Sequence, residues 1–338
     1  MSRPREDGIV IGTLEPGPRS SIADVGVTVG HVTVERTGVT AVVPPSLPVP
    51  AGTAVLNGAG ELTGSLEIRE WGILETPVYL TSTHAVGRVY DGAVTVAVEV
   101  EPRVGTEEFV IPVVGECDDS WLSEGRVVQV EADDVGRAVR AATGGAAAEG
   151  AVGAGTGMMT KGWKAGIGTA SRIAPSIGGA VGVLVLSNFY PPPGLVMDGV
   201  RVGEILGEPS GTTRSKAGSC IGVVAVDAAL SPHQLQRVAR RVGLGLARCG
   251  SVAHHGSGEI FLAFAAAGRR PRGEAAVMDV PDSALNDVFE AVVDASEEAV
   301  LNALWAAPEV RGREGRVGHA LPHDDVLELL ARHRRLGS

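Results

Sequence analysis

Ser219 stands at an abrupt change in the chain, directly after Gly218 and directly before a run of apolar residues. Residues 204–216 are polar and poor in large apolar side chains, whereas 220–226 have the composition of a buried strand. This arrangement favours a chain that cuts itself, because glycine permits a strained backbone and lets the serine hydroxyl attack the preceding carbonyl. An N-to-O acyl shift followed by hydrolysis would leave Ser219 as a new N-terminus.

A new N-terminus at Ser219 would carry the groups that nucleophilic catalysis needs. An α-amino group has a pKa of about 7.7–8.0, so near neutral pH much of it can act as a base. The amine sits on the same residue as the hydroxyl that it activates, so no histidine is required. The Gly-Ser dipeptide alone also fits an ordinary loop before a strand, so the argument depends on its surroundings.

Motifs for other common chemistries are missing from the sequence. There is no GxGxxG, no Walker A loop, no HExxH and no GxSxG. His319 and His323 form an isolated pair without a third ligand nearby. The three cysteines lack the spacing of a metal site or a disulfide framework; they are Cys117, Cys220 and Cys249. We therefore expect neither a metal nor a cofactor.

The elements that must position Ser219 are predicted from apolar runs and their periodicity. We expect mainly strands and loops up to about residue 130, with 44–50 as a proline-rich surface loop. Strands are predicted at 53–56, 78–80, 93–100, 109–114, 166–174, 178–189, 220–226 and 260–266. Helices are predicted at 135–143, after Ser231, and at 282–306 and 322–334. This order favours layered sheets and helices over regular βαβ alternation.

The composition of the 338 residues is that of a folded protein, with 44% hydrophobic and 20% charged residues. A net charge of −11 argues against a nucleic-acid partner, which needs a basic surface. No apolar run approaches the roughly 18 residues of a membrane span, and the first residues lack the apolar stretch of a signal peptide. We therefore expect a cytoplasmic protein without nucleic-acid or membrane partners.

Glycine and lysine contents are unusual. The chain has 47 glycines, which indicates many tight turns or strands that approach other backbone closely. Lysine occurs only at Lys161, Lys164 and Lys216, so nearly all of the 29 basic residues are arginine.

Many short blocks, in the same order, resemble the DmpA and β-peptidyl aminopeptidase family of self-processing serine hydrolases. The resemblance extends over nearly the whole chain and is clearest around Gly218-Ser219 and around Ser257 and Glu259. The matching blocks are 22–25, 29–31, 36–41, 56–64, 80–87, 114–119, 153–158, 218–230, 232–235, 239–248, 256–264, 297–304 and 321–324.

The resemblance implies a four-layer αββα sandwich, like the N-terminal nucleophile hydrolases but with different strand connectivity. Family members cut themselves before the nucleophile, which predicts fragments 1–218 and 219–338 here. The two fragments would form one domain, 1–338, because each supplies part of the same sheets. The resemblance also implies a homo-oligomer, a tetramer of processed pairs.

The resemblance also assigns roles to five side chains. Ser219 is implied as the nucleophile, with Gly218-Ser219 as the cleavage site. Ser257 and Glu259 match the residues that position and support it, and two residues apart on a strand they share one face. The other two roles are those of Asn188, as donor to the tetrahedral oxyanion, and Glu116, as the carboxylate that binds the substrate ammonium.

One departure from the family concerns the substrate pocket. Some members carry an aromatic residue near the position of Asp118, whereas this chain has none until Trp121. This leaves the choice among L-α, D-α and β-amino residues open. The glycines of 153–157 either line the site with backbone amides or serve packing.

The sequence thus predicts a serine aminopeptidase or amidase that releases N-terminal residues from short peptides, amides or esters. An acyltransferase is one alternative, since the ornithine acetyltransferase family shares the architecture, but that family uses threonine where this chain has Ser219. The other alternative is an unprocessed homologue without catalysis, acting as a binding protein.

Overall fold

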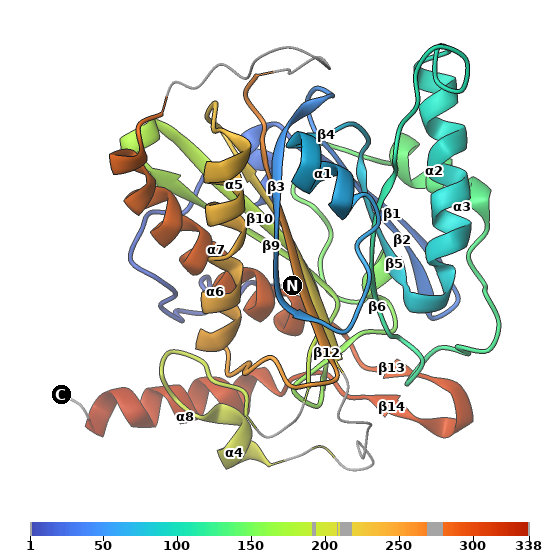
Figure 1. Ribbon diagram of the computed structural model, residues 1–338. Coiled ribbons are helices and arrows are strands. Elements are labelled where there is room, and N and C mark those ends of the chain that lie inside the picture. The colour runs from blue at the N-terminus through green and yellow to red at the C-terminus, as the bar shows by residue number, and fades with distance from the viewer. Residues whose placement is uncertain (1, 191–193, 208, 210–217, 269–279, 337–338) are drawn as a thin grey trace.

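Two β-sheets form the centre of the molecule (Figure 1). The computed structural model describes residues 2–190, 194–207, 209, 218–268 and 280–336. The larger sheet contains, in spatial order, β4 (Ile73–Leu74), β3 (Val49–Gly58), β12 (Ser257–Ala265), β11 (Gly218–Val226), β10 (Gly179–Asn188) and β9 (Ile167–Ala174). The smaller contains β1 (Thr28–Val34), β2 (Thr37–Val43), β5 (Val78–Ser82) and β6 (Val113–Cys117). Neighbours are antiparallel except for β11–β12 and β5–β6, which are parallel.

Helices cover the outer faces of both sheets (Figure 1). On the larger sheet lie α5 (Pro232–Ala239), α6 (Val242–Arg248) and α7 (Leu285–Trp305), and on the smaller lie α2 (Val86–Val100) and α3 (Ala132–Arg140). Besides short 3-10 helices, the other elements are α1 (Ser65–Trp71), α4 (Val202–Leu206), α8 (His323–Leu336) and the short strands β7 (Met159–Thr160), β8 (Trp163–Lys164), β13 (Val310–Arg311) and β14 (Val317–Gly318). This arrangement confirms the predicted αββα sandwich.

The layers are held together by three apolar clusters. One lies between the sheets and includes Leu186, Ile221 and Leu262; the others lie between each sheet and its helices. Every residue of β11 and of β12 is buried. A strand covered on both faces needs apolar side chains without alternation, which explains why these two strands were recognisable as continuous apolar runs.

Three predictions in the first half of the chain were wrong. The strand predicted at 109–114 is misplaced, because β6 begins only at Val113 and ends at Cys117. Residues 93–100 belong to α2 and not to a strand, because Val89, Ala93 and Val96 recur at helical spacing and form the buried face. The valine-rich composition had suggested a strand. Strand β3 already begins at Val49, so the predicted loop at 44–50 ends inside the strand, where proline is tolerated near the first residue.

Predictions in the second half agree better with the structure. Ser231 caps α5 through its side chain, which accepts a hydrogen bond from the backbone N–H of Gln234, and Pro232 occupies the first turn. Strands β9 and β10 lie where strands were predicted at 166–174 and 178–189, and they pair with each other. The polar segment 204–216 begins inside α4; residues 208 and 210–217 lie outside the described part of the chain.

Candidate active site

Ser219 is the second residue of β11, and its two strand neighbours carry predicted site residues. Across the antiparallel pair with β10 it lies opposite Asn188. On the parallel side, Gly218 lies opposite Ser257 and Ser219 opposite Gly258. Because side chains alternate along a strand, Ser219 and Asn188 share the face between the sheets, whereas Ser257 lies on the face of Gly218, beside the bond predicted to be cut.

The hydroxyl of Ser219 points back along its own chain. Its Oγ donates a hydrogen bond to the carbonyl oxygen of Gly218 at 2.8 Å, and the residue is only 6% exposed. The hydroxyl is therefore already next to the carbonyl that it would attack.

Ser257 and Glu259 form a buried hydrogen-bonded pair. The Oγ of Ser257 donates to Oε1 of Glu259, and neither residue is more than 1% exposed. Within the described part of the chain, Oε2 of Glu259 has no hydrogen-bond partner. Burial raises the pKa of Glu259, while the bond from Ser257 and the charge of Lys161 oppose that shift.

Sequence reasoning missed Lys161, although its charge acts on Glu259. Its Nζ donates to the carbonyl of Gly250 at 2.6 Å and lies 5.7 Å from the centroid of the Phe189 ring. Burial lowers the pKa of Lys161 to about 8, and the carboxylate of Glu259 counteracts this. The available signal was the scarcity of lysine: Lys161 and Lys164 stand three residues apart in a chain that otherwise uses arginine.

Asn188 ends β10 with a fully buried and fixed side chain. Its Oδ1 accepts a hydrogen bond from the backbone N–H of Met159 at 2.9 Å, and its Nδ2 donates to the carbonyl of Asp118 at 2.9 Å. These opposite bonds define which end of the amide is nitrogen, so the side chain presents an oriented donor next to Ser219.

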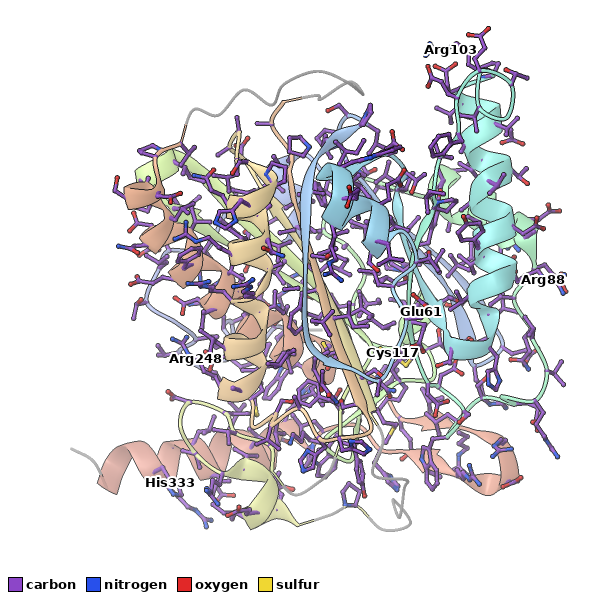
Figure 2. All side chains as sticks on the ribbon, in the orientation of Figure 1. Glu61, Arg88, Arg103, Cys117, Arg248 and His333 are labelled. Atoms are coloured by element: carbon purple, nitrogen blue, oxygen red, sulfur yellow. The ribbon has the colours of Figure 1, made fainter. Side chains whose placement is uncertain are left out.

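Glu116 reaches the same region from the smaller sheet. Its Oε1 accepts from the backbone N–H of Glu61 at 2.9 Å, and its Oε2 accepts from the hydroxyl of Thr83. Burial raises the pKa of Glu116. Figure 2 labels Glu61, whose backbone N–H contacts Glu116, and Cys117, the next residue of β6.

Gly60 marks how closely the two sheets approach at this point. A Cβ on Gly60 would lie 3.0 Å from Oε1 of Glu116 and 3.5 Å from the Cα of Gly258. The predicted residues on β6, β10, β11 and β12 therefore meet at one end of the sandwich. Thr83 was not predicted, since its role follows only from this contact.

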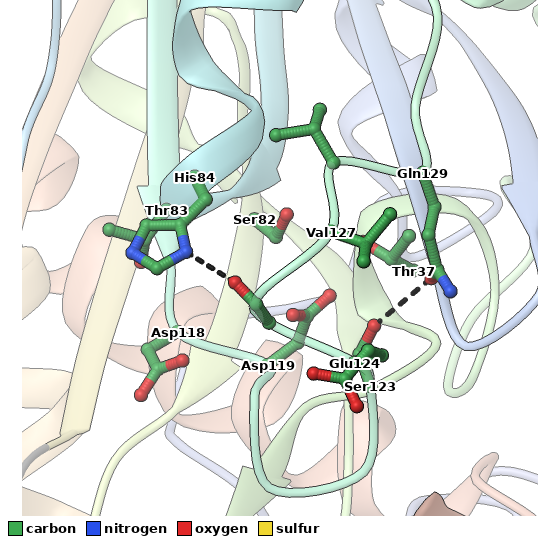
Figure 3. Close-up of a pocket in the computed structure, with 12 residues that line it drawn as sticks. Thr37, Ser82, Thr83, His84, Asp118, Asp119, Ser123, Glu124, Val127 and Gln129 are labelled. Atoms are coloured by element: carbon green, nitrogen blue, oxygen red, sulfur yellow. Dashed lines mark hydrogen bonds between the residues drawn. The ribbon is translucent and has the colours of Figure 1, made fainter.

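A small pocket of about 20 Å³ adjoins Glu116 and Asn188 (Figure 3). Thr83 and Asp118, which contact those two residues, are part of its wall. His84 lines it as well, with Nδ1 2.5 Å from the carbonyl of Gly125. Asp118, the residue that departs from the family pattern, thus lies in the wall next to the site, whereas Trp121 does not line this pocket.

The glycines of 153–157 serve close packing. A Cβ on Gly155 would lie 2.5 Å from the backbone nitrogen of Ile167, and one on Gly157 would lie 2.5 Å from the carbonyl of Arg36. Among the described residues, no three His, Cys, Asp or Glu side chains gather as a metal site would need. No helix in the described ranges has the length and apolar composition needed to cross a membrane.

Comparisons with known proteins agree with this geometry. The family model of peptidase family S58 matches residues 20–318. The β-peptidyl aminopeptidase BapA of Sphingosinicella microcystinivorans is 37% identical over an alignment of 362 residues, gaps included. The alignment covers 96% of this chain and 91% of that protein.

Solved structures of similar proteins have the same fold over nearly their whole length. The Burkholderia sp. β-aminopeptidase is 39% identical, with a TM-score of 0.89 and coverage of 98% of this chain and 99% of that chain. The L-aminopeptidase D-Ala-esterase/amidase of Ochrobactrum anthropi, described as a prototype of the serine aminopeptidases and a variant of the Ntn hydrolase fold, is 35% identical, with a TM-score of 0.91 and coverage of 99% and 100%. The chain therefore belongs to peptidase family S58 and is a hydrolase of the aminopeptidase type.

Proposed function

We propose that this aminopeptidase processes itself at Gly218–Ser219 and then uses Ser219 as an N-terminal nucleophile. The observation that carries the proposal is the strand register, in which Ser219 lies opposite Asn188 while Gly218 lies opposite Ser257. The nucleophile, an amide donor and a buried Ser–Glu pair thus meet on three adjacent strands.

The cut would proceed from the hydrogen bond that Ser219 already makes. Its Oγ attacks the carbonyl carbon of Gly218, the bond to the Ser219 nitrogen breaks, and the nitrogen takes up the hydroxyl proton as it becomes an amine. Water then hydrolyses the resulting ester, which leaves the carboxylate of Gly218 and the free hydroxyl and amine of Ser219.

In turnover, the α-amine of Ser219 takes the hydroxyl proton as the oxygen attacks the substrate carbonyl. Asn188 donates to the developing oxyanion, a contribution of about 3–4 kcal/mol for one such donor. The register of Ser257 beside Gly218 supports a role for the Ser257–Glu259 pair in holding the new amine. The leaving amine carries the proton away, and water hydrolyses the acyl-enzyme.

The substrates are short peptides, amides or esters with a free amino group that binds Glu116. The relatives named above are a β-peptidyl aminopeptidase and an L-aminopeptidase D-Ala-esterase/amidase, so L-, D- and β-aminoacyl residues all belong in the substrate panel. A homo-oligomer of processed pairs and a cytoplasmic location remain predictions; the cysteines of the chain, all free and buried, fit a reducing compartment.

The experiment that tests the proposal compares the wild type with Ser219→Ala. We expect the wild type to give two bands of roughly 22 and 12 kDa on a denaturing gel, scaled by length from 34.6 kDa, and to release p-nitroaniline from aminoacyl anilides. Ser219→Ala should stay uncut and inactive. Ser296→Ala, another buried serine, is the control and should behave as the wild type. Wild-type activity in Ser219→Ala would refute the role of Ser219 as the nucleophile. A wild type that stays uncut and inactive would favour the alternative of a binding protein without catalysis.

Glu116→Gln tests the recognition of the substrate amine. We expect KM to rise roughly tenfold or more, because a hydrogen bond to a charged partner is lost, with little change in kcat. Since burial raises the pKa of Glu116, the wild-type KM should rise as pH falls through that pKa, and the variant should lack this dependence. An unchanged KM would contradict the role.

A further inference from the structure

Lys164 is a wholly buried lysine with three backbone acceptors. Its Nζ donates to the carbonyls of Gly155 at 3.1 Å, Met158 at 2.8 Å and Ala165 at 2.5 Å. Burial lowers the pKa of Lys164 to about 7, and the charge of Asp119 opposes this shift. Three acceptors match the three N–H groups of the ammonium, whereas a neutral amine has only two, so the contacts favour the charged form.

The peptide unit that follows Met158 connects Lys164 to Asn188. Its carbonyl, on Met158, accepts from Lys164, and its N–H, on Met159, donates to Oδ1 of Asn188 at 2.9 Å. The ammonium thus polarises the peptide, and the peptide polarises the side-chain amide in the same direction. Hydrogen bonds that follow one another in this way strengthen one another, and the last group in the series is the Nδ2 donor of Asn188.

A short hairpin enforces this geometry. Strands β7 and β8 pair with Met159 opposite Lys164, and Lys161 and Gly162 between them have φ of 51° and 87°. Positive φ at both central residues defines the tight turn that fixes a two-residue hairpin and its register. The backbone N–H of Lys164 also donates to the carbonyl of His319 at 2.7 Å, which anchors the second strand of the hairpin.

We propose that Lys164 is a positioning residue for catalysis, which orients and polarises the amide of Asn188 through the Met158–Met159 peptide. This rests on the proposed function of Asn188 as the oxyanion donor. The competing interpretation is that Lys164 only caps the turn at Gly155 and contributes to stability.

A double-mutant cycle separates the two roles. Lys164→Met, Asn188→Ala and the double variant are assayed with an aminoacyl p-nitroanilide, and kcat is normalised to the processed fraction on a denaturing gel. We expect Lys164→Met to lower kcat about tenfold at unchanged KM, because the donor loses its charge assistance. In the Asn188→Ala background the same change should alter kcat less than twofold.

Asn302→Ala is the matched structural control, since Nδ2 of Asn302 donates to the buried carbonyl of Thr169 at 2.8 Å. It should lower Tm and leave kcat unchanged. If Lys164→Met does not fold, Lys164→Gln replaces it, because glutamine keeps N–H donors without the charge. If the cut itself is slowed, the same cycle is measured on the rate of self-cleavage.

Equal losses of kcat in both backgrounds would overturn the proposal, because Lys164 would then act independently of Asn188. An unchanged kcat in Lys164→Met, with kcat lowered in Asn188→Ala, would overturn it while the proposed function stands. An unchanged kcat in Asn188→Ala would remove both the oxyanion role and this proposal.

Discussion

Glu259 is the residue at which folding and chemistry conflict most clearly. It is fully buried, and only one of its carboxylate oxygens has a hydrogen-bond partner among the described residues. Burial raises its pKa because the ionised form loses its hydration. Yet the ionised form is the one that accepts from Ser257 and that, in the proposed mechanism, would balance an ammonium on Ser219. The site therefore keeps a group that the folded protein holds at a cost in stability.

Glu259→Gln should raise stability and lower activity. The pKa of a glutamate is ordinarily 4.5, and that of Glu259 is higher in the folded protein. At pH values between the two, the folded state binds more protons than the unfolded state, so stability falls as pH rises. Above the pKa of Glu259 in the folded protein, the full free-energy cost of burying its ionised carboxylate is present. The variant should melt at a higher temperature than the wild type at pH 7, and this gain should vanish below about pH 4.5.

We expect kcat of Glu259→Gln to fall about a hundredfold, while KM keeps the pH dependence that Glu116 gives it. Ser257→Ala keeps the buried carboxylate and is the control for the stability effect. A wild-type kcat in Glu259→Gln would refute a role for Glu259 in the reaction.

At the scale of elements, the parts predicted from sequence were those whose signal is local. Apolar runs predicted β9 to β12, and the resemblance to the family selected Ser219, Asn188 and Glu116. Thr83, which contacts Glu116, and Lys161, whose charge acts on Glu259, were not predicted, because they reach the site only through folding. The reason for glycine at 218 also changed: Gly218 lies within β11 and is not among the residues with left-handed φ.

The space next to Gly218 is too small for a Cβ, because the end of β10 lies against it, and this explains why residue 218 is glycine. The variant Gly218→Ala tests this explanation. A Cβ there would lie 2.8 Å from the nitrogen of Tyr190 and 2.9 Å from the carbonyl oxygen of Asn188. The start of β11 must then move from β10, and we expect self-cleavage to slow about a hundredfold, the effect of a misplacement of roughly 1 Å. Gly87→Ala on α2, with open space around its Cβ, should cut at the normal rate. Normal cutting by Gly218→Ala would refute the crowding argument.

At the scale of the whole molecule, the predicted cut would leave the second fragment enclosed by the first. Its strands β11 and β12 lie in the middle of the larger sheet, between β10 and β3 of the first fragment. Helix α7, also from the second fragment, packs on β9 and β10. Each fragment would therefore expose core strands if the two separated.

We expect the processed protein to keep its native size after the cut. Size-exclusion chromatography or native mass spectrometry should give the same particle for the wild type and for uncut Ser219→Ala, while only the wild type gives two bands on a denaturing gel. Separation requires denaturant, because it opens the hydrogen-bonded sheet on both sides of β11 and β12. Free fragments on a native column would show that the sheet does not hold them.

The burial of lysine has a consequence for the reactivity of the protein surface. In the described part of the chain, both lysine side chains are buried with their ammonium groups on backbone carbonyls. Among the described residues, the permanently cationic side chains at the surface are those of arginine, which amine-directed reagents do not modify. Cleavage before Ser219 would add one new α-amine, in the position where substrates bind. Acylating labels and cross-linkers that target amines would thus distinguish the mature protein from its precursor by chemistry alone.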